Sequence, residues 1–203
     1  MKKFLFCILF VLFSATLMAQ LTAIVELNKS SALSIFVETN MMNFSLVQNG
    51  DKLLRTPVAV SANLQKNKLF VNHNKLEIDV KGFKSDNLIG QSEFYKLMKA
   101  EKFPKMNIEL VCYESSSECK STGTAVLNIT VTNVTRKYDF PVSIGQNDGQ
   151  LHIIGRKRIS ITDFGLSAPT TLLFGMAKVN EQIVIDLNLH CSYRLNNEEL
   201  AVR

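Results

Sequence analysis

The sequence lacks the short motifs that mark the common enzyme chemistries. It has no glycine-rich phosphate-binding loop, no Gly-x-Ser-x-Gly nucleophile elbow and no His-Glu-x-x-His zinc motif. Its Asp and Glu residues are dispersed, and nothing in the pattern pairs two of them for acid–base work. We therefore expect a binding or structural protein that is not an enzyme and needs no cofactor. An enzyme of unrecognised type is the weakest alternative.

Histidine is scarce, and its placement argues against a metal site. The three histidines, His73, His152 and His190, lie far apart in the sequence. None of them has the short spacing to a cysteine that zinc sites use. We therefore expect no bound metal.

The sequence also has no block of basic residues. The formal net charge of +5 becomes +3 once Lys2 and Lys3 are removed with the leader described below, and the other Lys and Arg are scattered among Asp and Glu. This distribution excludes a nucleic-acid partner. The small cluster Gly155-Arg156-Lys157-Arg158 is interpreted as a solvated strand end; the alternative is a transient membrane contact through an anionic head group.

The first 19 residues have the three parts of a secretory signal peptide. Lys2 and Lys3 form a positively charged start, Phe4 to Phe13 is an unbroken apolar run, and a milder segment ends at Ala19-Gln20. The apolar run is shorter than the ~20 residues of a spanning helix, which favours a cleaved leader over a retained anchor. We therefore expect a periplasmic or secreted protein whose residues 20–203 form a single domain.

Three cysteines remain after the leader, and disulfides persist outside the cytoplasm. Cys112 and Cys119 flank a polar stretch between two strand-like runs. We expect them to face each other across the neck of a hairpin and to form a disulfide. Cys191 is then a buried, unreactive thiol.

Strict alternation of apolar and polar residues is the dominant pattern of the chain. It predicts a series of half-buried strands, each with one inward face. Pro141 lies on the outward parity of one of them and predicts a sheet edge or a bulge there. The inward positions are Leu33, Ile35 and Val37; Leu76, Ile78 and Val80; Met106, Ile108, Leu110 and Cys112; Ala125, Leu127, Ile129 and Val131; Tyr138, Phe140, Val142 and Ile144; Ile159 and Ile161; and Ile183, Ile185, Leu187 and Leu189.

Turn residues separate these runs, and one segment breaks the alternation. Between about 92 and 101, apolar residues recur at helical spacing, with Ser92 as the expected N-cap and Pro104 just past the end. The turn signals are Asn49-Gly50-Asp51, Ser115 to Ser117 and Asn147-Asp148-Gly149.

We therefore predict an all-β fold: an antiparallel, lipocalin-like barrel of about eight strands with one short α-helix. Closure into a barrel removes the exposed edges of a long sheet. A barrel of this size is just wide enough to be filled by side chains or to hold one elongated ligand. Alternation reports burial and not a cavity, so the pattern alone favours a filled core.

Several ordered segments are similar to those of the YceI-like family of polyisoprenoid-binding proteins. The segment Gly123 to Arg136 resembles the family's "G-x-L-T-I-x-G-V-T-R" stretch, and Ile159 to Leu166 resembles its strand that ends in Asp-Phe-Gly. Val179 to Ile185 resembles its closing strand, and Phe94 to Pro104 with the strand that follows resembles its helix and "F-x-x-x-x-Y-P" motif. The resemblance runs over about residues 90 to 190.

The resemblance implies an extended barrel whose apolar tunnel holds a long isoprenoid chain or a related lipid such as a quinone, without catalysis. The alternative is a structural or partner-recognition domain with a filled core. The sequence does not decide between a monomer and a dimer. The candidate ligand contacts are Ile108, Leu110, Leu127, Ile129, Val131, Phe140, Val142, Ile159, Ile161, Phe164, Ile185 and Leu187.

The segment Asp163-Phe164-Gly165 is interpreted as a latch that closes the barrel. Strand parity predicts that Asp163 turns inward, where the following turn would satisfy its carboxylate with backbone N–H groups. Phe164 is expected to plug the barrel end or to flank the mouth of the tunnel. Gly165 is expected to permit the backbone geometry of the turn.

Overall fold

The computed structural model describes residues 20–53, 58–65, 67–72, 74–116, 121–147, 149–168 and 178–195. The predicted signal peptide lies outside these residues. The strands are β1 Gln20–Leu27, β2 Ala32–Thr39, β3 Phe44–Asn49, β4 Val58–Gln65, β5 Lys68–Asn72, β6 Leu76–Asp79, β7 Lys105–Ser115, β8 Thr122–Val131, β9 Val134–Asn147, β10 Gln150–Ser160 and β11 Val179–Leu195. The helical elements are α2 Gly50–Leu53, η1 Val80–Gly82, α3 Leu88–Leu97 and η2 Ile161–Phe164.

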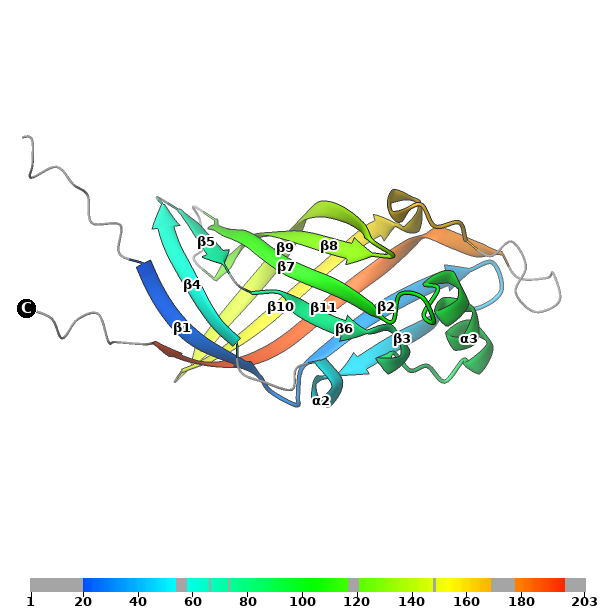
Figure 1. Cartoon of the computed structure of the whole chain (residues 1–203), viewed down its shortest axis with the longest axis horizontal. Coiled ribbons are helices and arrows are strands. Elements are labelled where there is room, and N and C mark those ends of the chain that lie inside the picture. The colour runs from blue at the N-terminus through cyan, green and yellow to red at the C-terminus, as the bar shows by residue number, and fades with distance from the viewer. Residues whose placement is uncertain are drawn as a thin grey trace, which may run out of the picture.

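Eight strands form a closed antiparallel ring, so the predicted barrel is confirmed. Their order is β1-β4-β5-β7-β8-β9-β10-β11, and the pairing of β1 with β11 closes the ring. The long strand β11 pairs with β2 along its first half and with β1 along its second half. Strand β3 extends the sheet beyond β2, and β6 pairs with the start of β7. The result is an elongated, uneven barrel with α3 at one end (Figure 1).

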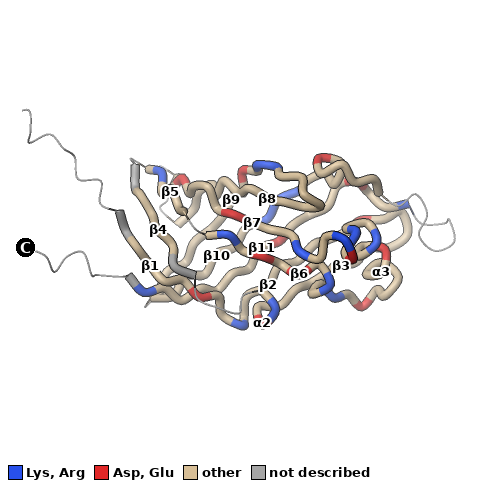
Figure 2. The backbone as a smooth tube through the Cα atoms, in the orientation of Figure 1, with Lys and Arg blue, Asp and Glu red and all other residues tan. Residues whose placement is uncertain are grey.

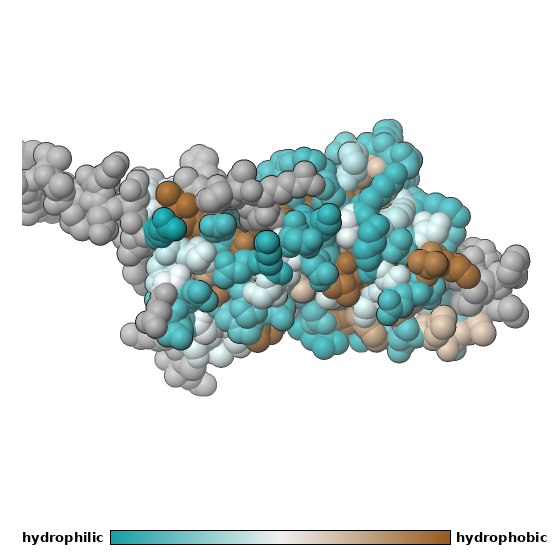
Figure 3. All heavy atoms as spheres, turned by 90° about the horizontal axis from the view of Figure 1, so that it is seen from below, coloured by the Kyte–Doolittle hydropathy of each residue, from teal (hydrophilic) through white to brown (hydrophobic). Residues whose placement is uncertain are grey.

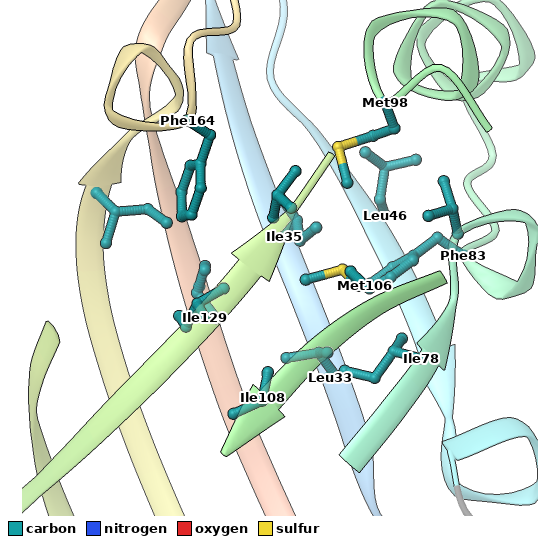
Figure 4. Packing of buried hydrophobic residues seen from close by; sticks show 14 of the residues in the cluster. Leu33, Ile35, Leu46, Ile78, Phe83, Met98, Met106, Ile108, Ile129 and Phe164 are labelled. Carbon is teal, nitrogen blue, oxygen red and sulfur yellow. The ribbon is translucent and has the colours of Figure 1, made fainter. Parts of the chain in front are cut away.

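The alternation predicted for the strands is confirmed in β2, β8 and the other strands that line the barrel. In β2, Leu33, Ile35 and Val37 are buried while the residues between them are partly exposed. Because successive side chains of a strand point to opposite faces, this alternation places one apolar row inside the ring. The rows meet in one buried hydrophobic cluster, part of which is shown in Figure 4.

The ring is closed between β9 and β10 over only part of their length. These strands pair only from Val142 to Asn147 on β9, opposite Gln150 to Gly155 on β10. Pro141 lies just beyond the last of these pairs, so the prediction that it marks an edge is confirmed. A proline there removes no hydrogen bond that β10 needs.

The predicted helix exists, but it begins earlier than the pattern indicated. Helix α3 spans Leu88–Leu97, and its N-cap is Asn87, whose side-chain oxygen accepts a hydrogen bond from the Gly90 N–H at 2.9 Å. The prediction of Ser92 as the cap was wrong because Asn87 already satisfies the free N–H groups of the first turn. The expected turn at Asn49-Gly50-Asp51 is instead the entry to the single helical turn α2.

The predicted disulfide between Cys112 and Cys119 is not supported at the end that the structure describes. Cys112 is a free, buried thiol, and Cys119 lies outside the described residues. The strand register places Val126 opposite Cys112, three pairs inside the last pair of the hairpin, which joins Ser115 to Gly123. Cys112 is therefore not at the neck of the hairpin, where the prediction put it. Cys191 is buried and free, as expected.

Candidate functional site

An apolar cavity lies inside the barrel, beneath α3 and η2. Its volume is about 80 Å³. The walls come from the inner faces of the strands at this end and from the two helical elements that cover it (Figure 4). The lining residues are Ile35, Val37, Phe44, Leu46, Gly90, Glu93, Phe94, Leu97, Met98, Met106, Ile129, Val131, Ile159, Ile161, Phe164, Leu166, Val179, Asn180, Ile183 and Ile185.

Helix α3 forms one side of the cavity and is held there by aromatic contacts. The ring of Phe94 packs edge-on against Phe83, with ring centres 5.5 Å apart. The Tyr95 hydroxyl donates a hydrogen bond to the Phe83 carbonyl at 2.6 Å. These contacts anchor the helix to the segment after η1, so the apolar face of α3 is directed at the barrel interior.

The single turn η2 forms the opposite side of the cavity. Phe164 is buried and lines the cavity, in agreement with its predicted place at the barrel end. Its ring centre lies 6.1 Å from that of Tyr138 on β9. Gly165 has a φ of 69°, the left-handed conformation that closes the turn, as predicted for this glycine.

Asp163 does not turn inward, so this prediction was wrong. The chain enters η2 at Ile161, which ends the strand alternation and leaves the Asp163 side chain exposed. Its carboxylate instead accepts a hydrogen bond from the Tyr138 hydroxyl at 2.7 Å. Burial of the Tyr138 hydroxyl, together with this bond, raises the pKa of Tyr138. The latch therefore runs between two side chains, from η2 to the part of β9 that pairs with β8 but not with β10.

Two polar side chains, Glu93 and Asn180, interrupt the otherwise apolar lining. Glu93 forms an ion pair with Lys96 at 2.6 Å. The arrangement suits an apolar ligand with one polar end. At about 80 Å³, however, the cavity is smaller than the ~300–1,000 Å³ of typical ligand sites.

Movable side chains border this small volume. Met98 projects from the end of α3 and Met106 from the start of β7, and both are buried in the lining. Methionine has three rotatable bonds and adapts readily to irregular spaces. A longer ligand therefore requires these side chains, or α3 itself, to move.

The structure brings six of the twelve predicted ligand contacts to the cavity: Ile129, Val131, Ile159, Ile161, Phe164 and Ile185. The other six belong to the strands or their buried cluster but do not line this cavity. Of these, Leu110 is partly exposed and five are buried: Ile108, Leu127, Phe140, Val142 and Leu187.

Sequence reasoning missed the contribution of β2, β3 and α3 to the cavity. The apolar alternation at Ile35 and Val37 was visible, and so was the helical spacing of Phe94, Leu97 and Met98. The sequence pattern did not show that β2 pairs with β11, which places the first strands beside the last.

The basic cluster at Gly155–Arg158 lies in the middle of β10 and not at a strand end, although its two arginines are exposed, as a solvated cluster requires. Arg158 donates two hydrogen bonds to the Glu38 carboxylate, at 3.1 and 3.3 Å, and Arg156 lies 3.4 Å from Asp186. Both pairs are on the outer surface of the sheet. Its arginines are therefore engaged on the strand surface and do not face the cavity.

The part of the chain that the structure describes contains no group of three or more His, Cys, Asp or Glu side chains placed to hold a metal ion. Within the same residues, no helix has both the length and the hydropathy needed to cross a membrane.

Comparisons with known proteins identify the family and structures of similar fold. The family model described as "YceI-like domain" matches residues 25–191. The chain is similar to the crystal structure of Burkholderia cenocepacia BcnA, with a TM-score of 0.55 and 13% identity over 79% of this chain and 95% of that one. It is also similar to a polyisoprenoid binding domain from Saccharophagus degradans implicated in plant cell wall breakdown, with a TM-score of 0.56 and 8% identity over 84% and 98%. No curated protein sequence matches.

Proposed function

Since the chain belongs to the YceI-like domain family, we propose that it is a binding protein that holds an isoprenoid or a related long-chain lipid in the cavity beneath α3 and η2. The observation that carries the proposal is the lining of that cavity, which is almost wholly aliphatic and aromatic and lies inside a closed barrel. A solved structure of the same fold is described as a polyisoprenoid binding domain, which supports the choice of ligand class.

The chemistry of the lining favours such a ligand. Transfer of apolar surface out of water contributes ~25 cal/mol per Å², or about 0.8 kcal/mol per methylene group. A prenyl chain has no polar groups along its length, so it loses no hydrogen bonds on entering this site. Glu93 and Asn180 are the polar lining residues that a hydroxyl or a quinone-type head group would meet.

Movement of the lining accommodates the chain. Rotation of Met98 and Met106, with displacement of α3, enlarges the cavity toward the volume that a ligand needs. The apolar surface that the ligand buries then offsets the free energy needed to open the cavity.

The proposal includes neither catalysis nor a cofactor, and it places the protein in the periplasm or outside the cell. The apolar lining offers no nucleophile and no pair of acid and base groups in contact. The location rests on the predicted leader at residues 1–19.

A second function is favoured by the small volume of the cavity. If about 80 Å³ is its full extent, the barrel is a filled structural or partner-recognition domain. The two functions differ in whether protein purified from its own host carries a lipid.

The direct test is native mass spectrometry, with lipid extraction, of protein purified from its own host. We expect a bound prenyl lipid or quinone. Repeated recovery of empty protein, together with no binding of added prenyl alcohols or quinones, supports the filled domain instead.

Two variants of β11 test where the lipid lies. Ile185 and Leu187 are neighbours on the inner face, but only Ile185 lines the cavity. We expect Ile185→Phe to fill the cavity and abolish retention of lipid with little loss of stability. Leu187→Phe adds bulk at a buried position outside the cavity, at a cost of ~1–3 kcal/mol in unfolding free energy, while the folded molecules keep their lipid. Equal lipid retention by both variants would contradict the proposed position.

A further inference from the structure

Four exposed apolar side chains gather at one end of the barrel. Leu88 is 72% exposed, Met41 56%, Met42 50% and Ile89 49%. Most large apolar side chains of the described residues are buried, and these four account for most of the exceptions. We call them the apolar rim. Figure 3 shows hydrophobic atoms on the surface at this end.

The apolar rim is continuous across two segments that are distant in the sequence. Met41 and Met42 lie in the turn between β2 and β3, whereas Leu88 and Ile89 begin α3. The side chain of Asn87 joins the two segments, because its Nδ2 donates to the Met42 sulfur at 3.6 Å. The fold does not require apolar residues at the start of α3, where polar and acidic residues are favoured.

The rim also borders the cavity. Phe44, two residues after Met42, lines both the cavity and the open groove between β3 and the segment Lys84–Ile89. Gly90, next to Ile89, allows Phe44 to pack closely, since a Cβ at Gly90 would lie 2.6 Å from the Phe44 ring. One aromatic ring in close contact with a glycine therefore separates the inside of the barrel from the rim.

Two lysines without a carboxylate partner in the described part of the chain lie near the rim. Lys84 stands beside the groove, and Lys178 is held next to the rim by the hydrogen bond from its N–H to the Asn40 side chain at 2.7 Å. No ion pair with a carboxylate is found for either lysine among the described residues, whereas Asp86 is the acidic residue of the groove. Figure 2 shows further lysines around α3.

We propose that the apolar rim docks on a lipid bilayer that carries anionic head groups, and that lipid enters the barrel there, past Phe44. Apolar side chains that enter the interface beside lysines that face phosphates are a combination that binds membrane surfaces peripherally. The entry route rests on the proposed function; the docking does not. Met41, Met42, Leu88 and Ile89 supply the apolar contact, and Lys84 and Lys178 the electrostatic one.

The experiment is cosedimentation of the purified protein with vesicles of phosphatidylcholine, with and without phosphatidylglycerol. We expect binding to the anionic vesicles that weakens with added salt. The double variant Leu88→Glu/Ile89→Glu should lower the vesicle affinity at least about tenfold, because each apolar side chain withdrawn from the interface removes roughly a factor of ten. Glutamate suits the first turn of a helix, so α3 should remain folded.

Ile154→Glu is the matched control, because Ile154 is 50% exposed on β10, away from the rim. It should bind vesicles like the parent. Equal binding by the double variant and the parent, or no binding of the parent to anionic vesicles, overturns the docking proposal. A dimer of the parent that the double variant abolishes also overturns it, because the rim would then be covered by a second copy.

The sequence contains no tryptophan, which allows a second readout. Leu88→Trp should show a blue shift of its fluorescence on addition of anionic vesicles, and Ile154→Trp should not. This signal does not depend on whether the barrel retains a lipid. Vesicle binding by a protein that never carries lipid would leave the docking intact and refute the proposed function alone.

Discussion

Tyr138 and Asp163 form a contact that joins β9 to η2 where the two neighbouring strands have separated. The 2.7 Å hydrogen bond from the tyrosine to the carboxylate spans this gap, and the Tyr138 ring packs on Phe164. Because Phe164 lines the cavity, the bond positions one wall of the site without contacting a ligand. Asp163 is thus a structural residue, held by a partner that differs from the one expected.

Replacement of Asp163 by alanine should lower the free energy of unfolding by ~0.5–1.5 kcal/mol, the range for one hydrogen bond. Lipid retention by the folded protein should change little, since the carboxylate is exposed and outside the cavity lining. Denaturant unfolding and native mass spectrometry of Asp163→Ala measure the two effects. An unchanged midpoint combined with loss of lipid would make Asp163 a ligand contact.

The same contact predicts a dependence of stability on alkaline pH. Burial and the bond to Asp163 raise the pKa of Tyr138 above its ordinary value of 10.0, so the folded protein keeps a proton that the unfolded chain loses. The stabilisation is therefore complete below about pH 10 and declines as the pH rises further. We expect the free energy of unfolding to fall more steeply above pH 10 in the parent than in Tyr138→Phe.

Cys191 responds to alkali in the same direction, because burial raises the pKa of its thiol to about 11. Both proteins in the comparison contain Cys191, so the difference between them reports Tyr138. Identical pH profiles for parent and Tyr138→Phe would show that the hydroxyl is not perturbed.

At the scale of elements, α3 covers one side of the cavity, and its start depends on one side chain. Asn87→Ala removes the bond to the Gly90 N–H and the bond to the Met42 sulfur. We expect a loss of about 1 kcal/mol in stability from the missing cap. Hydrogen exchange should quicken in the first turn of α3, and bound lipid should leave faster. Asn87→Asp, which keeps a capping oxygen, should restore the slow exchange.

Much of this architecture followed from the sequence because period-2 alternation reports directly which strand face is buried. The rows at Ile129 and Val131 and at Ile159 and Ile161 were correctly assigned to the interior. The pairing of strands was harder to predict from the sequence, since alternation does not say which strands are neighbours. That β11 has β2, β10 and β1 as partners therefore came only from the structure.

Only half of the residues that were predicted to contact the ligand line the cavity, because alternation reports burial and not a cavity. Inward parity is identical for Ile185, which lines the cavity, and for Leu187, which is buried but does not line it. Local pattern contains no information on where the packing ends and the cavity begins. Asp163 was misplaced because η2 interrupts the strand at Ile161, which reverses the expected direction of the next side chains.

At the scale of the whole molecule, the core of the strands differs from the covered cavity. Phe140 and Leu33 are fully buried on strands and do not line the cavity, whereas two short helical elements cover it. Native-state hydrogen exchange should therefore be slowest in β7, β8 and β9, and fastest at α3 and η2. Addition of a lipid ligand should slow exchange at α3 and η2 and leave these three strands unchanged. Uniform protection along the barrel would contradict this difference.

The closure of the ring by β1 and β11 has a consequence for biosynthesis. Residues 23–27 pair with residues 191–195, so two segments far apart in the sequence must meet before the sheet is continuous. Until β11 has been synthesised, β2 and β10 each lack a neighbour, and β1 has only β4. Contacts of such long sequence separation form slowly. The nascent chain consequently cannot close its ring before β11 has left the ribosome.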